Sequence, residues 1–259
     1  MSTSDSFQSK TIWITGGAGY LGSPITAALD AAGATTICLE LPGRAEALVR
    51  ERALTRTIPV SLDLTDLPAQ RAEVQRLVAA HGVPNGLVHL PFVSSGGKTM
   101  EEISTDEMDR TLTRSLTPAF ELCRTVAGAM AETGRGSVVL FSSMYGLVAP
   151  DPKIYSAPMA PNPVDYGASK AALIQISRYM AVHFGPRNVR FNCIAPGPFP
   201  NPKIQAELPQ FIAQLSAKTA LGRIGHRDEV VGPTLFLLSD AASYVTGHTL
   251  VVDGGWTSW

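Results

Sequence analysis

The sequence predicts an α/β protein built on a doubly wound parallel sheet, with helices on both faces of the sheet. Short apolar runs rich in β-branched residues alternate with longer stretches of helical periodicity. This alternation is the pattern of βαβ units that feed a buried parallel sheet. The 259 residues show no internal repeat and no low-complexity linker, so we expect a single domain.

The apolar runs predict about seven strands. In chain order these strands cover residues 11–15, 35–40, 58–62, 87–90, 137–142, 189–194 and 249–252. The helical periodicity predicts helices over residues 21–32, 67–80, 104–131, 165–184, 203–217 and 227–239. Asp228 and Glu229 support the start of the last helix, because acidic side chains are favourable at a helix N-terminus. The proline-rich segment 149–163 predicts a long loop, because proline lacks the N–H that a helix or a central strand needs.

Charge and composition argue against several kinds of partner. Lysine and arginine number 21 against 22 acidic residues, and a formal charge of -1 gives no broad attraction to nucleic acid or to anionic membranes. Cys38, Cys123 and Cys193 lie far apart, without the spacing of a metal site or a disulfide framework. Met1–Lys10 is polar, and no apolar run approaches the ~20 residues that span a bilayer. We expect a cytoplasmic protein that binds a small molecule and no metal.

A glycine-rich turn follows the first expected strand and opens the first expected helix. Gly16, Gly19 and Gly22 have the spacing G-x-x-G-x-x-G, with Tyr20 and Leu21 before the last glycine. Glycine is needed there because the turn takes unusual backbone angles and because a Cβ would keep a pyrophosphate away from the N–H groups of the helix N-terminus. The context predicts an NAD(P)-binding domain of the Rossmann type; a glycine-rich turn without a ligand is the alternative.

Two acidic residues follow the next two strands. Glu40 ends the second strand, where an acidic side chain accepts hydrogen bonds from the adenosine ribose and repels a 2′-phosphate. It favours NAD over NADP, although Arg44 offers a partner to a phosphate and Glu40 would also suit a solvated strand end. Asp63, which Leu64 follows, stands where its carboxylate could accept a hydrogen bond from the adenine amino group. A turn-forming aspartate is the other interpretation.

Tyr166 and Lys170 are four residues apart in an expected helix, so both side chains emerge on one face. A phenol has a pKa near ~10, and a neighbouring ammonium lowers this pKa by stabilising the phenolate. Proton transfer near neutral pH then becomes feasible. Ser142 and Ser143 end the fifth strand at the carboxyl edge of the sheet, where doubly wound folds bind ligands. We expect Tyr166 to be the proton donor or acceptor; a surface pair with the same spacing is the alternative.

From about Lys10 to Gly255 the sequence resembles the short-chain dehydrogenase/reductase family. The resemblance rests on five segments in order: the glycine-rich turn, the set Ser143/Tyr166/Lys170, and residues 192–197, 223–225 and 253–255. It implies an NAD(H)-dependent oxidoreductase (EC 1.1.1.-) that interconverts a secondary alcohol and a ketone, assembled as a homotetramer or homodimer. It further implies that Ser143 orients the substrate oxygen, that Tyr166 is the acid or base, and that Lys170 holds the nicotinamide ribose. It also implies that the cofactor is lined by Pro196, Gly197 and Phe199.

Several positions depart from the family pattern. The length and the Asp253-Gly254-Gly255 ending resemble the compact branch of about 250 residues, yet His89-Leu90-Pro91-Phe92 stands where that branch has Asn-Asn-Ala-Gly. Ser115 stands where an asparagine commonly positions a relay water beside the lysine, so it joins the implied catalytic set. His89 has a structural interpretation as well as a functional one. The glycine spacing and Ser142–Gly146 resemble the extended branch, which includes sugar-nucleotide epimerases and dehydratases.

In this family the segment before the catalytic tyrosine lines the substrate pocket. Residues 145–165 form a long substrate loop here, and its side chains Tyr145, Lys153 and Tyr155 are expected to bind substrate, with Asp151, Asn162 and Asp165 as further polar groups. Such a loop could recognise a polyhydroxylated or anionic molecule, and family members with similar insertions act on sugars or sugar acids. A subunit-packing insertion is the alternative. Residues 198–220 are expected to form a lid, or else an ordinary amphipathic surface helix.

The substrate expected from these features is a sugar, a polyol or a sugar acid. Two other functions stay open from the sequence. An epimerase or dehydratase of a carbohydrate precursor would retain its NAD through the reaction. A catalytically inactive cofactor-binding protein would fit the altered segment His89–Phe92 and the serine at position 115.

Overall fold

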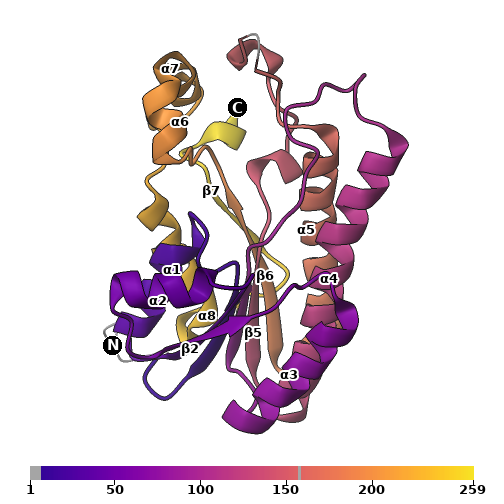
Figure 1. Ribbon diagram of the computed structural model, residues 1–259, viewed down its shortest axis with the longest axis vertical. Helices are drawn as coiled ribbons and strands as arrows, with labels where there is room; N and C mark the ends of the chain where they lie inside the picture. The colour runs from indigo at the N-terminus through magenta and orange to yellow at the C-terminus, as the bar shows by residue number, and fades with distance from the viewer. Residues whose placement is uncertain (1–6, 157–158) are drawn as a thin grey trace.

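The computed structural model describes residues 7–156 and 159–259. Most of the polar start Met1–Lys10 and Pro158 of the proline-rich segment lie outside these ranges. Figure 1 shows a central sheet with α1, α2 and α8 on one face and α3, α4 and α5 on the other. Each face has its own cluster of buried apolar side chains, as a doubly wound sheet requires.

All seven expected strands form, and every pairing between them is parallel. The spatial order is β3-β2-β1-β4-β5-β6-β7, so the predicted doubly wound fold of a single domain is confirmed. The order reverses between β1 and β4, and such a switch point opens a crevice at the carboxyl ends of the strands. The strands are β1 Thr11–Thr15, β2 Thr35–Glu40, β3 Thr57–Ser61, β4 Gly86–His89, β5 Gly136–Phe141, β6 Val189–Pro196 and β7 Thr249–Val252.

Four helices lie within a few residues of the predicted bounds: α1 Gly22–Ala31, α3 Leu67–His81, α4 Thr105–Glu132 and α5 Val164–Phe184. Their starts have local causes. The Asp66 side chain caps α3 by accepting a hydrogen bond from the Ala69 N–H at 3.0 Å. At the start of α4, Ser104 and Glu107 form a reciprocal capping box.

Three segments differ from the prediction. Helix α2, Arg44–Arg52, was not expected, because only Ala45 and Leu48 of its residues are buried and its apolar periodicity is weak. The helix expected over 203–217 is two helices, α6 Pro202–Glu207 and α7 Pro209–Ala217. Pro209 supplies no N–H to the preceding turn, and the residue before it leaves the helical region. The helix expected over 227–239 begins as a 3₁₀ turn, Arg227–Val230, before α8 Val231–Leu238.

The expected loop at 149–163 contains, in its described part, only a 3₁₀ turn over Pro152–Ile154. Figure 1 places α6 and α7 at the carboxyl end of the sheet, on the same side as the chain's C-terminus. This end of the molecule therefore gathers the segments that the sequence assigns to the substrate loop and to the lid.

Candidate active site

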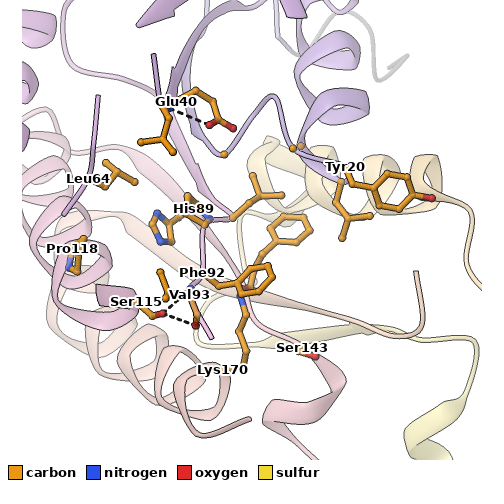
Figure 2. A pocket seen from close by; sticks show the side chains of 18 of the residues that line it. Tyr20, Glu40, Leu64, His89, Phe92, Val93, Ser115, Pro118, Ser143 and Lys170 are labelled. Atoms are coloured by element: carbon orange, nitrogen blue, oxygen red, sulfur yellow. Dashed lines mark hydrogen bonds between the residues drawn. The ribbon is translucent and has the colours of Figure 1, made fainter. Parts of the chain in front are cut away.

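A cleft with a cavity volume of about 620 Å³ opens at the carboxyl ends of the strands. Its walls include every residue that the sequence assigned to catalysis or to the cofactor. These are Gly16, Gly19, Tyr20, Leu21, Gly22, Glu40, Asp63, Leu64, Ser115, Ser143, Tyr166, Lys170, Pro196, Gly197 and Phe199. Three of the five residues assigned to the substrate, Tyr145, Lys153 and Tyr155, do not line it. Figure 2 shows the cleft from close by, with Glu40 at one end and Ser143 and Lys170 at the other.

The glycine-rich turn has no room for a larger residue at Gly16 or Gly22. Gly16 has a φ of +73°, which favours glycine, and a Cβ on Gly22 would lie 2.1 Å from the Gly16 carbonyl oxygen. The turn therefore brings the backbone and the N-terminus of α1 directly to the cleft. This arrangement fits a dinucleotide pyrophosphate, because the free N–H groups and the helix dipole both favour an anion.

Glu40 is buried at the end of β2, and its carboxylate is fixed by backbone donors. Oε1 accepts from the Ala18 N–H of the glycine-rich turn and Oε2 from the Leu41 N–H, both at 3.2 Å (Figure 2). Arg44 approaches Oε2 at 3.7 Å. Glu40 thus stabilises the turn while lining the cleft, and its contact with an adenosine ribose stays a prediction.

Asp63 forms a local turn as well as lining the cleft. Its carboxylate accepts from the Thr65 N–H at 2.9 Å and from the Thr65 hydroxyl at 2.8 Å. These two hydrogen bonds hold the pKa of Asp63 below its usual value. The turn-forming role is therefore present in the structure, and contact with an adenine stays a prediction.

Tyr166 lies in the first turn of α5, beside Ser143 at the end of β5. Burial raises the pKa of the Tyr166 phenol, and a hydrogen bond with the Ser143 hydroxyl opposes this rise. The lowered pKa that the sequence predicted from Lys170 is therefore wrong for the structure as it stands. The Ser143 oxygen accepts from the Tyr145 N–H at 3.1 Å, which leaves its proton for a ligand. The two hydroxyl groups can therefore address one substrate oxygen.

Lys170 is only 2% exposed, one turn along α5 from Tyr166. Its Nζ donates to the Phe141 carbonyl at 2.7 Å and lies 5.8 Å from the centre of the Tyr166 ring. Burial lowers the pKa of Lys170 to about 7. The charge of this amine is therefore readily gained and lost near neutral pH.

Ser115, on α4, is hydrogen-bonded to both backbone groups of one residue. Its hydroxyl donates to the Val93 carbonyl at 3.1 Å and accepts from the Val93 N–H at 3.0 Å (Figure 2). The only proton of this hydroxyl is therefore committed to the loop that follows β4. Ser115 fastens that loop in the structure, and its role in a water relay stays a prediction.

His89 ends β4 in the floor of the cleft and is buried. Its Nδ1 lies 2.9 Å from the Thr15 hydroxyl. Burial and the nearby charge of Lys170 lower the pKa of His89 to about 3, so the imidazole is neutral at physiological pH. The contact ties β4 to β1 and favours the structural interpretation of this histidine.

Two residues near Tyr166 have roles that the sequence did not indicate. The Phe92 ring packs edge-on against the Tyr166 ring, with 5.2 Å between ring centres. Asp165, expected to be a polar group of the substrate loop, is instead completely buried and accepts three hydrogen bonds, from Thr111, Ser95 and Tyr166. The signal for Phe92 was present in the sequence, because a bulky ring stands where the compact branch has glycine.

The substrate loop and the lid meet in an apolar cluster beside Tyr166. We call this the aromatic cluster; its buried members are Met144, Tyr145, Ile154, Leu215 and Trp256, with Tyr155, Tyr166, Phe211, Ile212 and Ile224 packed against them. The hydroxyl groups of Tyr145 and Tyr155 bond to each other at 2.8 Å, and Lys153 is exposed. The polar groups expected to hold a sugar are thus paired with each other or face solvent.

The lid residues contact both neighbouring parts of the site. The Tyr20 hydroxyl of the glycine-rich turn donates to the Pro200 carbonyl at 3.2 Å, and Lys218 after α7 pairs with Asp151 of the substrate loop. The segment 198–220 therefore bridges the expected cofactor and substrate sides.

The described residues contain neither a candidate metal site nor a helix suited to cross a membrane. Within residues 7–156 and 159–259, no group of three or more His, Cys, Asp or Glu side chains is placed to hold a metal ion. In the same ranges no helix has the length and apolar character to cross a membrane.

Known proteins resemble this chain over nearly its whole length. A family model described as enoyl-(acyl carrier protein) reductase matches residues 18–257. A cyclopentanol dehydrogenase of Comamonas sp. (strain NCIMB 9872) is 32% identical over 255 residues, covering 96% of this chain and 97% of that protein. A probable galactose dehydrogenase of Rhizobium meliloti (strain 1021) is 28% identical over 253 residues, covering 95% of this chain and 94% of that protein.

A solved structure agrees with these relatives. The crystal structure of a short chain dehydrogenase from Leptospira borgpetersenii serovar Hardjo-bovis (strain JB197), with bound NAD+, superposes with a TM-score of 0.87 at 30% identity. The superposition covers 99% of this chain and 96% of that one. The chain therefore belongs to the short-chain dehydrogenase/reductase family, whose members typically use NAD(P), and is a dehydrogenase that acts on CH–OH groups.

Proposed function

We propose that the protein is an NAD(H)-dependent dehydrogenase that interconverts a secondary alcohol and a ketone, with Tyr166 transferring the proton. The observation that supports this most strongly is the grouping of Ser143, Tyr166 and Lys170 in one cleft with the glycine-rich turn. The cleft holds a proton donor, a second hydroxyl to orient the substrate oxygen, and a buried amine. These are the groups that a carbonyl–alcohol conversion requires from the protein.

In this proposal each side chain has one task. NAD, when bound, supplies the hydride chemistry. Ser143 donates a hydrogen bond to the reacting oxygen and so orients it. During ketone reduction Tyr166 gives a proton to that oxygen and becomes a phenolate, which the positive charge of Lys170 stabilises. During alcohol oxidation the phenolate takes a proton from the same oxygen.

Glu40 supports a preference for NAD over NADP. Its buried carboxylate lines the cleft beyond the glycine-rich turn, where it would accept hydrogen bonds from ribose hydroxyl groups and repel a 2′-phosphate. Arg44 offsets part of this charge from 3.7 Å. The two backbone N–H groups that bind the Glu40 carboxylate hold it in place. The preference for NAD over NADP therefore does not depend on Arg44.

The substrate proposal has two candidates. A sugar, polyol or sugar acid is supported by the galactose dehydrogenase relative. An apolar secondary alcohol is supported by the aromatic cluster around Tyr166 and by the cyclopentanol dehydrogenase relative. An apolar wall stabilises an apolar substrate and leaves the hydroxyl groups of a sugar without partners.

One experiment tests both the reaction and the cofactor. The purified protein is supplied with NAD or NADP and a panel of polyols, sugar acids and cyclic alcohols, and the absorbance of the reduced cofactor is followed. We expect turnover with NAD, and we expect Glu40→Gln to improve the kcat/KM for NADP relative to NAD by about tenfold, since it removes the charge and keeps the shape. Turnover with NADP alone would contradict the cofactor proposal, and no turnover with any alcohol would contradict the reaction.

A further inference from the structure

The Phe92 side chain lies over the Lys170 amine, which the family resemblance assigns to the nicotinamide ribose. The Lys170 Nζ is 5.0 Å from the centre of the Phe92 ring, and the same ring packs at an interplanar angle of 71° against Tyr166. Figure 2 shows Phe92 beside Lys170 in the cleft. An ammonium at this distance is attracted to the face of an aromatic ring.

The backbone on the C-terminal side of Phe92 is held firmly. Val93 is bonded through both its N–H and its carbonyl to Ser115, and the Ser95 N–H donates to the buried Asp165 carboxylate at 2.9 Å. On the other side the chain leaves β4, where His89 is anchored to Thr15. The position of the Phe92 backbone is therefore fixed by α4, α5 and the sheet.

The Phe92 ring itself is weakly held. Phe92 is 54% exposed, and its ring packs against the Tyr166 ring and faces the Lys170 amine. Exposed side chains change rotamer within nanoseconds, whereas a backbone held by three hydrogen bonds at Val93 and Ser95 does not follow. Movement at this point is consequently a rotation of one ring about its own side-chain bonds.

Lys170 has three N–H donors, of which one is used by the Phe141 carbonyl. The ring of Phe92 covers part of the remaining approach to this amine. We propose that Phe92 is a gate: its ring alternates between the position beside Lys170 and a position turned aside, and the nicotinamide ribose binds when the ring is turned aside. The proposal rests on the proposed function, because it needs a dinucleotide in the cleft.

A gate of this kind weakens binding in a predictable way. Because a ligand that needs the open position binds only the fraction of molecules that are open, removing the ring lowers the Kd. We expect Phe92→Ala to lower the Kd of NADH about fivefold, which corresponds to about 1 kcal/mol. The Kd of ADP should stay unchanged, because ADP lacks the ribose that meets Lys170.

The test is titration calorimetry of the purified variants with NADH and with ADP. Phe92→Tyr keeps the ring and should bind NADH like the wild type, and Met100→Ala removes an exposed apolar side chain of the same loop that does not line the cleft. An unchanged or raised Kd for NADH in Phe92→Ala, or an equal gain for ADP, would overturn the gate. Wild-type protein that fails to bind NADH would instead overturn the proposed function itself.

Discussion

Lys170 combines a nearly complete burial with a positive charge, and the protein compensates this charge only in part. One carbonyl and two aromatic rings face the amine, and burial lowers its pKa from the usual 10.5 to about 7. The folded protein therefore binds the Lys170 proton more weakly than the unfolded chain does. For such a group the stability of the fold increases as the pH rises from about 7 towards 10.5.

Replacing this lysine should accordingly stabilise the fold at the expense of activity. We expect Lys170→Met to increase the free energy of unfolding, with a larger gain at pH 6, where the wild-type amine is charged, than at pH 9. Urea denaturation at the two pH values measures this difference. Lys153→Met, at an exposed lysine, should show no such dependence, and a gain that is equal at both pH values would contradict the burial of a charge at position 170.

Asp165 shows why the immediate surroundings of Tyr166 could not be predicted from the sequence. A carboxylate in a proline-rich loop is normally solvated, and nothing in the local pattern indicates that Thr111 on α4 and Ser95 after β4 will donate to it. Burial by itself would raise the pKa of Asp165, and the hydrogen bonds from Thr111 and Ser95 outweigh it, so the carboxylate stays charged. Long-range contacts of this kind depend on the assembled fold.

The start of α5 and the loop after β4 form one unit through this carboxylate. Asp165→Ala would leave the Thr111 hydroxyl and the Ser95 N–H without an acceptor, and we expect a loss of about 3 kcal/mol in the free energy of unfolding. Asp66→Ala, which removes an exposed cap of α3, should cost about 1 kcal/mol. Urea denaturation of both variants makes the comparison. Equal losses would show that Asp165 is an ordinary helix-start residue.

The helices differ in how well the sequence indicated them. Helix α4 has a long apolar stripe and a capping box at Ser104, and it was predicted within a residue of its bounds. Helix α2 has two buried residues and five charged ones, so its sequence shows too few apolar positions to reveal a helical period. The break between α6 and α7 was signalled by Pro209, which supplies no N–H to the preceding turn.

The whole molecule is a series of βαβ units, and the strand, helix and turn patterns in the sequence all predict this arrangement. Strand order could be anticipated because parallel strands with crossover helices leave few arrangements, and the switch point between β1 and β4 then locates the cleft. The glycine-rich turn could be assigned to that cleft from its place between a strand and a helix. The pair Tyr166 and Lys170 could be assigned there only together with Ser143 and the other motifs of the family resemblance. The packing of the loop at 145–165 could not be predicted, because it depends on long-range contacts with α7 and the C-terminal Trp256.

The measurement that bears most directly on the proposed function is the rate of NADH formation by the wild type and by Tyr166→Phe, with the substrate found active in the panel. Removing the phenolic hydroxyl should lower kcat by about 100-fold or more, because the proton transfer loses its donor and acceptor. The Kd of NADH should change by less than about twofold, because the ring and its packing stay. A Tyr166→Phe variant that turns over at close to the wild-type rate would contradict the assignment of proton transfer to Tyr166.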